Sequence, residues 1–391
     1  MSGFVLENRE SATGSMFHNR RAYRHLRPGW NTGDIRRSIM KQLSGESIMK
    51  PLRALIYSVV ALSCLLSGIA SAQVVTEFST GSAGSNNGSN TSITTGPDGN
   101  LWFTEVNNSA IGRITPTGTV TFFTAGITQG TPVGIAKGPD GNLWFTENLT
   151  SIGRITPTGT VTQFPVANPN ARVNAITAGP DGNLWFTEDS PTGPGKIGRI
   201  TPTGTLTEFS AGSNFTSSNG ANYPGITTGP DGNLWYTEVR TSSIGRITPT
   251  GAVTEFGSGI SGFPHGITAG PDGNLWFTED GSQGQIGRIT PTGTVTEFAI
   301  VSSATVIPAG ITTGPDGNLW FANGASFQGG VGRITPTGTV TLFTAGITSS
   351  SNPLGITAGP DGNLWFTESA PNVNKVGRIT TGDLIFANGF D

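Results

Sequence analysis

The chain has 391 residues, of which 58 are glycine and 25 are proline, a composition that favours strands joined by tight turns over helices. From residue 73 onward, 12 Lys and Arg stand against 21 Asp and Glu, a balance of −9. This charge disfavours attraction to phosphate groups, so we expect no nucleic-acid partner. The one cysteine, Cys64, lies in a segment that we expect to be removed, which leaves no disulfide and no thiolate metal ligand.

Residues 49–72 have the layout of a secretory signal peptide. Lys50 and Arg53 precede an apolar stretch over 54–66, and an Ala-Ser-Ala triplet follows. The apolar stretch is shorter than the roughly 20 residues that a membrane-spanning helix needs. We therefore predict cleavage near Gln73, a secreted or periplasmic protein, and no membrane association after cleavage.

The first 48 residues do not fit this arrangement, because a signal peptide begins at the start of a chain. They are polar, rich in arginine and without apolar periodicity, and a suitable initiator follows them at Met49. We interpret residues 1–48 as a misassigned start or a disordered tail, and residues 73–391 as a single domain.

The domain consists of one repeated sequence. The words GPDGNLWFTE recur with small changes, and their tryptophans are Trp102, Trp144, Trp185, Trp235, Trp276, Trp320 and Trp365. The spacings are 42, 41, 50, 41, 44 and 45 residues. Self-similarity at such a period is the signature of a repeat architecture, and here it indicates seven units.

The fifth copy illustrates the strands expected in each unit. We predict a first strand at 266–271, a second at 274–279, a third at 286–290 and a fourth at 294–298. Asp-Gly and Thr-Gly turns join them, because glycine supplies the positive φ that tight hairpins require. Each unit is therefore a four-stranded antiparallel sheet.

Alternation along the second strand defines how the sheets pack. Leu275 and Phe277 project from one face and Trp276 from the other, so both faces need burial. Small sheets arranged radially, each covered on both sides by its neighbours, meet this requirement. The sequence therefore predicts an all-β fold, a seven-bladed β-propeller.

Two segments compete to complete the last blade. QVVTEF at 73–78 matches the fourth strand of the repeat but stands alone at the start of the domain, and the seventh copy ends irregularly. We predict that Val74–Phe78 joins the last blade, which closes the ring and removes an exposed edge. Residues 383–386 are the alternative occupant.

Internal comparison of the copies separates two ends of the ring. The PDGN and PTGT turns hardly change, whereas the loop after WFTE and the connection between blades vary in length. In an up-and-down blade these two variable loops emerge on the same face. We expect function on that face, at the mouth of the central channel, because binding residues tend to lie on variable loops over a rigid scaffold.

WFTE followed by IGRIT, with a preceding PxGIT strand and GPDG turn, resembles the virginiamycin B lyase (streptogramin B lyase) family, over essentially all of 73–391. The resemblance implies a magnesium-dependent carbon–oxygen lyase that linearises a cyclic depsipeptide antibiotic by elimination, and thereby antibiotic resistance. In the family, a Pro-His motif in the first strands of the last two blades and nearby carboxylates carry the chemistry. A histidine can take the proton α to a carbonyl, and Mg²⁺ on carboxylates can hold the lactone oxygens.

The position of that histidine, two residues before the isoleucine of each first strand, is called the mouth position below. It is occupied by Thr91, Val133, Asn174, Pro224, His265, Ala309 and Leu354. Pro264-His265-Gly266 matches the motif, but in the fifth copy, and the seventh copy has Asn352-Pro353-Leu354 instead. His265 is our candidate base, with Glu279 and Asp280 as candidate metal ligands. Capping or lining the channel is the alternative role for His265.

The acidic residues that recur in the copies are more simply explained by structural roles than by catalysis. Six of the seven second strands end in glutamate, and we expect each to pair with the arginine of its own IGR, as Glu279 with Arg288. Asp272 of the fifth GPDG is expected to form its turn rather than to bind calcium.

Two functions are compatible with this sequence. The first is a secreted lyase-like propeller, monomeric, that acts on a small cyclic peptide or ester with Mg²⁺. The second is a non-catalytic secreted propeller that binds a peptide, glycan or protein through its variable face. The single histidine at the mouth positions favours the second, and the Pro-His-Gly match favours the first.

Overall fold

The computed structural model describes residues 73–81, 90–127, 130–148, 151–190, 194–211, 225–281, 284–300, 306–325, 329–370 and 373–382. The expected tail (1–48), the expected signal segment (49–72) and the alternative closing segment (383–386) lie outside these ranges. All secondary structure within them is strand, β1 to β28. No helix long and apolar enough to cross a membrane occurs in them.

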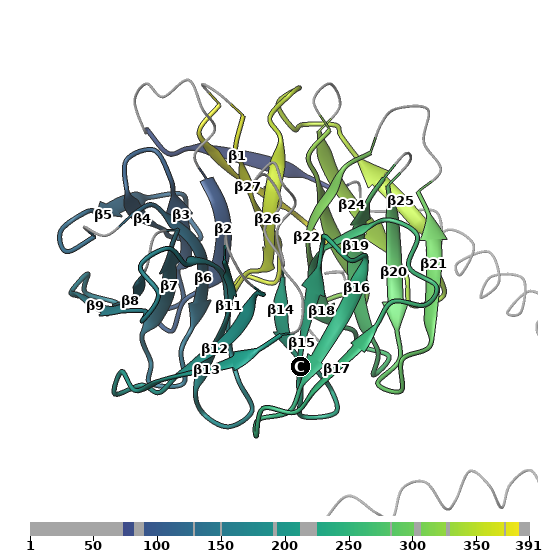
Figure 1. Cartoon of the computed structure of the whole chain (residues 1–391). Coiled ribbons are helices and arrows are strands. Elements are labelled where there is room, and N and C mark those ends of the chain that lie inside the picture. Colours follow the sequence, from purple (N-terminus) through teal and green to yellow (C-terminus); the bar gives the residue numbers. More distant parts are fainter. Residues whose placement is uncertain are drawn as a thin grey trace, which may run out of the picture. The chain divides into compact units, whose positions relative to one another are not determined.

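The strands form seven antiparallel sheets of four strands each, which surround a central axis as the blades of a propeller (Figure 1). Blades 1 to 3 contain β2 (Asn90–Thr95), β3 (Leu101–Glu105), β4 (Ala110–Ile114) and β5 (Val120–Phe123); β6 (Pro132–Lys137), β7 (Leu143–Glu147), β8 (Ser151–Ile155) and β9 (Val161–Pro165); and β10 (Arg172–Ala178), β11 (Leu184–Asp189), β12 (Lys196–Ile200) and β13 (Leu206–Ser210). Blades 4 and 5 contain β14 (Ile226–Thr228), β15 (Leu234–Glu238), β16 (Ser243–Ile247) and β17 (Val253–Phe256); and β18 (Phe263–Ala269), β19 (Leu275–Asp280), β20 (Gln285–Ile289) and β21 (Val295–Ala299). Blades 6 and 7 contain β22 (Pro308–Thr313), β23 (Leu319–Asn323), β24 (Gly330–Ile334) and β25 (Val340–Phe343); and β26 (Pro353–Ala358), β27 (Leu364–Glu368), β28 (Lys375–Ile379) and β1 (Val75–Ser79). The predicted fold class and the predicted number of blades are confirmed.

Blade 7 takes its outermost strand from the other end of the domain. β1 pairs antiparallel with β28, with Val75 opposite Ile379 and Phe78 opposite Val376. Phe78 also stacks on Trp365, with the ring centroids 5.4 Å apart. The predicted closure of the ring by the N-terminal strand is therefore confirmed.

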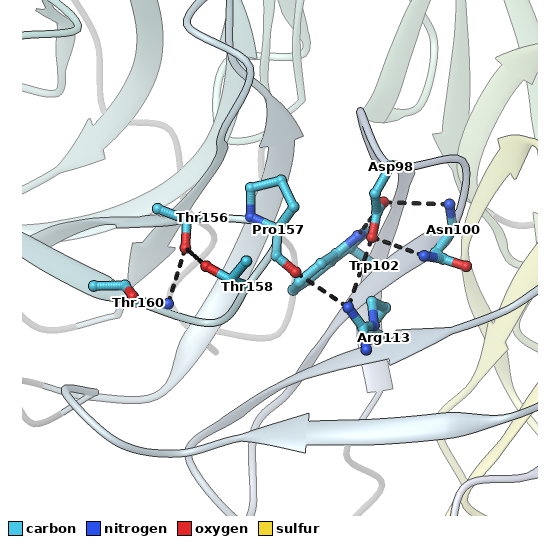
Figure 2. Close-up of polar contacts among 8 residues, drawn as sticks. All are labelled: Asp98, Asn100, Trp102, Arg113, Thr156, Pro157, Thr158 and Thr160. Carbon is cyan, nitrogen blue, oxygen red and sulfur yellow. Dashed lines mark hydrogen bonds and ion pairs between the residues drawn. The ribbon is translucent and has the colours of Figure 1, made fainter.

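A recurring aromatic unit, illustrated here in blade 1, fixes each blade to the next. Trp102 stacks on Phe123, and the guanidinium of Arg113 lies 5.6 Å from the first ring and 5.5 Å from the second. Arg113 donates to the carbonyl oxygen of Pro157 in blade 2 at 3.1 Å, while Asp98 accepts from Trp102 Nε1 at 2.9 Å (Figure 2). Stacked pairs and cation–π contacts of this kind contribute about 0.5–1.5 kcal/mol each beyond the burial of apolar area.

The predicted pairing of Glu279 with Arg288 is wrong. In the antiparallel β19–β20 hairpin Arg288 lies opposite Trp276, and Glu279 lies opposite Gln285 near the other end. Arg288 Nη1 therefore approaches Asp272, at 3.9 Å. The predicted turn role of Asp272 is confirmed, because its Oδ1 accepts from the backbone N–H of Asn274 and from Trp276 Nε1.

The innermost strands approach one another closely around the axis. A methyl group on Gly266 would lie 2.6 Å from the carbonyl oxygen of Ala309 in blade 6, which leaves no room for a side chain. The hydroxyl of Thr278 accepts from Gly266 N at 2.9 Å and donates to the same Ala309 carbonyl at 2.6 Å. Thr237 joins blade 4 to the His265 carbonyl in the same way, at 2.7 Å. These contacts fix the backbone of the mouth positions and leave their side chains free to differ.

We predict that Trp276→Ala lowers the free energy of unfolding by about 3–5 kcal/mol, because the indole is fully buried and stacked. Trp276→Phe keeps an aromatic ring and loses the Nε1–Asp272 hydrogen bond, so we expect a smaller loss of about 1–2 kcal/mol. Denaturant unfolding followed by tryptophan fluorescence measures both. Equal stability of the alanine variant and the unsubstituted protein would contradict the packing role.

Candidate active site at the channel mouth

The first strands of all seven blades line an axial cavity of ≈ 240 Å³. Its wall is made of one small residue and one isoleucine from each first strand, such as Gly266 and Ile267 in blade 5, with serine in blade 1 and alanine in blade 3 as the small residue. The mouth positions lie one residue nearer to the variable loops. The central cavity therefore has an almost uniform wall, and chemical variety begins at its mouth.

His265 lies in an irregular part of β18. Phe263 and Pro264 pair with Asp280 and Glu279, but the next paired residue is Ile267, so a β-bulge contains His265 and Gly266. Bulges redirect side chains, and the same irregularity occurs at the matching residues of blades 1, 2, 3, 6 and 7, so the bulge belongs to the repeat and the histidine is what differs in blade 5. The imidazole is 8% exposed and Phe263 is 49% exposed, so a buried base lies two residues from an uncovered aromatic ring.

The environment of His265 favours the neutral imidazole. Burial lowers the pKa of His265 below its ordinary value, and the negative charge of Asp280 partly opposes this shift. A neutral imidazole at neutral pH is the form that can accept a proton from a substrate.

The two predicted metal ligands point in different directions. Glu279 and Asp280 are consecutive residues of β19, so their side chains project from opposite faces of the blade. Glu279 Oε2 accepts from the backbone N–H of Gly262 at 2.9 Å, on the face that packs toward blade 4. Asp280 acts on His265 at the mouth.

Glu279 and Asp280 cannot bind one Mg²⁺ ion together. Their side chains project from opposite faces of the sheet and do not reach a common point. Among the residues that the structure describes, no group of three or more His, Cys, Asp or Glu side chains could hold a metal ion. Any magnesium requirement is therefore unsupported by the arrangement of the described residues.

The second-strand glutamates belong to a buried structural system between the blades. All six are at most 1% exposed, and each lies near the first residue of the third strand and the residue before phenylalanine in the fourth. Blades 3, 4, 5 and 7 carry a second acid there, and blades 3 and 7 also supply a lysine that bonds to it, Lys196 to Glu208 and Lys375 to Glu77. Blade 2 has Gln163 and Ser151 instead, and both donate to Glu147. A lysine therefore offsets the paired acids in two blades, whereas blades 4 and 5 hold two acids without one.

Burial raises the pKa of several of these glutamates. The pKa of Glu188 rises to about 7, through burial and then the charge of Glu208, although Lys196 opposes the shift. The pKa of Glu368 rises to about 8, through burial and then the charge of Glu77. The pKa of Glu279 is also raised, by burial above all. These acids take up protons near neutral pH without facing the mouth.

Sequence reasoning missed the exposed Phe263 and the lysines of blades 3 and 7. The lysines could have been found, because Lys196 and Lys375 occur only in copies whose fourth strand carries a second acid and whose second strand ends in glutamate. The exposure of Phe263 gave no signal, since an aromatic residue at a strand end is as often buried.

The chain was compared with known proteins. A model described as "Virginiamycin B lyase family" matches residues 64–257 and 215–387. No match was found among the curated proteins. Among solved structures, a streptogramin B lyase is 32% identical with a TM-score of 0.67, and the alignment covers 79% of this chain and 97% of that one.

Two structures of virginiamycin B lyase from Staphylococcus aureus are also similar. One is 34% identical with a TM-score of 0.68, and the alignment covers 79% of this chain and 99% of that one. The other, a catalytically inactive histidine-to-alanine variant with quinupristin, is 33% identical with a TM-score of 0.67 at the same coverage. Several less similar propellers share the fold alone.

We predict that Glu188→Gln weakens the pH dependence of stability. The pKa of Glu188 is about 7 in the folded protein against an ordinary 4.5, so the folded state holds the proton more tightly. The stabilisation is complete below pH 4.5 and is lost as the pH rises through about 7. The thermal midpoint of the variant relative to the unsubstituted protein should therefore increase between pH 4.5 and pH 8. Thr292→Ala, at an exposed turn, is the control, and parallel curves for Glu188→Gln and the unsubstituted protein would contradict the burial of an unpaired carboxylate.

Proposed function

Because the chain belongs to the virginiamycin B lyase family, we propose that it opens an ester bond of a cyclic depsipeptide by elimination, with His265 as the general base. The observation that carries the proposal is the placement of His265. It occupies a mouth position, buried within a bulge and next to a carboxylate, on a scaffold about one third identical to two lyases.

The reaction follows from the chemistry of an imidazole. A neutral nitrogen of His265 takes the proton from the carbon α to a carbonyl, and the electrons of that C–H bond form a C=C bond to the neighbouring carbon. The C–O bond on that carbon breaks, and its electron pair leaves on the carboxylate. The product is linear, contains an alkene and has the same elemental composition as the cyclic substrate, because no water is added.

Burial supports each of these steps. Exclusion of water around an imidazole that is 8% exposed keeps the base neutral before the reaction and strengthens its interaction with nearby charge afterwards. The backbone of His265 is held by two hydrogen bonds to its carbonyl, from Thr237 Oγ1 at 2.7 Å and from Gly225 N at 3.0 Å. The backbone that carries the base is therefore fixed to blade 4.

The substrate class is a small cyclic peptide or ester, and quinupristin, with which a similar lyase was studied, is the first probe. Such an activity would inactivate an antibiotic outside the cytoplasm, in keeping with the secretory signal layout of residues 49–72. We expect the protein to act as a monomer, because the closed ring has no unpaired sheet edge between first and last blades.

A second candidate function is non-catalytic binding of a peptide, glycan or protein at the variable face. It is favoured by the residues at the mouth positions of blades 6 and 7, Ala309 and Leu354, where the resemblance leads us to expect histidines. On this alternative, Phe263 and His265 would contact a ligand that leaves unchanged.

We predict that incubation with quinupristin gives a linear product of unchanged mass, with a new chromatographic retention time and absorption from a conjugated alkene. Hydrolysis would instead add the mass of one water. His265→Ala should lower the rate by about 10²–10⁴-fold. Circular dichroism checks that the variant is folded, since Thr237 and Gly225 bond to the backbone of residue 265 rather than to its side chain. No product from the unsubstituted protein, together with retained binding of quinupristin, would support the binding module instead.

We predict that the ring opening of quinupristin, an isomerisation because the mass is unchanged, continues in the presence of EDTA. Transfer of a proton to His265 uses the imidazole alone, and Glu279 and Asp280 lie on opposite faces of the blade and cannot share one ion. Measurement of the initial rate before chelation, after chelation and after addition of Mg²⁺ checks this. Loss with EDTA and recovery with Mg²⁺ would contradict this prediction and support the requirement that the family resemblance implies.

A further inference from the structure

Resting on the proposed function, we propose that Asp280 is a positioning residue for the reaction, the charge partner that stabilises the imidazolium of His265 after it takes the proton. The proposal assigns to Asp280 a role through His265 and not through a metal ion. It rests on the register of one strand pair and on a comparison of the blades.

The register brings Asp280 to the channel mouth. In blade 5 the last residue of β19, Asp280, pairs with the first residue of β18, Phe263, two residues before His265. The bulge between Pro264 and Ile267 shifts the alternation of side chains at His265. Asp280 and the imidazole are close enough for the carboxylate charge to act on the ring.

The seven blades can be compared at two places, the residue after the second-strand glutamate and the mouth position. An acid at the first place occurs only with certain residues at the second. The residue after the second-strand glutamate, or after Asn323 in blade 6, is Val106, Asn148, Asp189, Val239, Asp280, Gly324 or Ser369. An acid occurs there in blades 3 and 5 only. Their mouth positions carry Asn174 and His265, the residues of this set whose side chains bear N–H donors. In blade 3 Asn174 Nδ2 donates to the Arg172 carbonyl at 3.3 Å and Arg172 lies opposite Asp189, whereas the first strand of blade 5 offers no basic group other than His265. In the other five blades the mouth position lacks an N–H donor and the acid is absent.

No other described charge acts on His265 from the elements packed around it. The flanking first strands, β14 and β22, have the sequences ITT and PAGITT, which contain no charged residue. Glu279 lies on the opposite face of β19 and bonds to Gly262. The field of Asp280 at the imidazole is therefore not duplicated within the part of the chain that the structure describes.

The role of the negative charge of Asp280 follows from the transfer of a proton to His265. Removal of the substrate proton turns the neutral imidazole into a cation, so a carboxylate that stays ionised stabilises the product of the step more than its reactant. The same charge would hold the protonated imidazole until the proton is released to solvent. An uncharged group of the same shape, such as the amide of Asn, would lack this effect.

The test is an NMR titration of His265 in the full chain, with the His265→Ala spectrum assigning its signal among the three histidines. Asp280→Asn should move the midpoint of His265 to lower pH by about half a unit or more, because an attractive charge is lost. Asp280→Glu should retain most of the original midpoint. Asp189→Asn, the same change at the matching place in blade 3, should leave it where it was. An unchanged midpoint in Asp280→Asn would overturn the inference.

The rate of quinupristin isomerisation supplies the second readout. Asp280→Asn should lower kcat by about tenfold or more, less than His265→Ala, and move the acidic limb of the pH–rate profile to lower pH. A shifted midpoint with an unchanged kcat would overturn the role of Asp280 in the reaction. A shifted midpoint in a protein that converts no ester would support the charge pairing and overturn the proposed function instead, so the two failures can be told apart.

Discussion

The constraint on which the structure depends is that each small sheet has two apolar faces. Leu275 and Phe277 cover one face of blade 5 and Trp276 covers the other, and all three are fully buried. A sheet of this kind can exclude water only between two neighbours, so the blades must form a ring in which no face is left over. The stacked Trp–Phe pair with an arginine above it occurs in every blade, and in blade 5 the arginine joins the apolar face to the next blade by donating to the carbonyl of Pro336. Closure by β1 follows from the same requirement, because Phe78 supplies the ring that Trp365 would otherwise lack.

The close approach of the first strands also defines where chemistry can be placed. In five blades a glycine follows the mouth position and has no room for a side chain, and the carbonyl of the mouth residue accepts from the neighbouring blade. At the mouth position, the backbone and not the side chain therefore has the structural role. A Val, Asn, His, Ala or Leu can be present there at little cost to the scaffold, and the side chain is free to serve a ligand.

The sequence was sufficient for the fold because seven near-identical copies report the same periodicity, and each turn carries the glycine that its geometry needs. It was insufficient for the polar contacts, where the predicted Glu279–Arg288 pair was wrong. Counting the antiparallel register would have corrected this, since LWFTE runs against QIGRI and places Trp276, not Glu279, opposite Arg288. The site was predictable in part. His265 stood out as the one histidine of the domain, but the register shift that surrounds it, which recurs at the matching residues of blades 1, 2, 3, 6 and 7, was not visible in the strand pattern.

Blade 5 carries two acids side by side in sequence that belong to different systems in space. Glu279 faces the buried layer between blades, where glutamates recur and lysine, glutamine or serine balances them, so its charge is a property of the scaffold. Asp280 faces the mouth, where an acid occurs in blades 3 and 5 only, and its charge acts on the single histidine of the domain. Because side chains alternate along β19, Glu279 and Asp280 lie on opposite faces of the blade. The buried glutamate of the scaffold and the acid beside the candidate base can therefore coexist within one blade. A group that recurs in nearly every copy is explained by what every copy must do, which is to pack. Asp280 does not recur in most copies, and the mouth residue beside it also differs from those of the other blades. Its presence therefore requires a local explanation, and the pairing with His265 provides one.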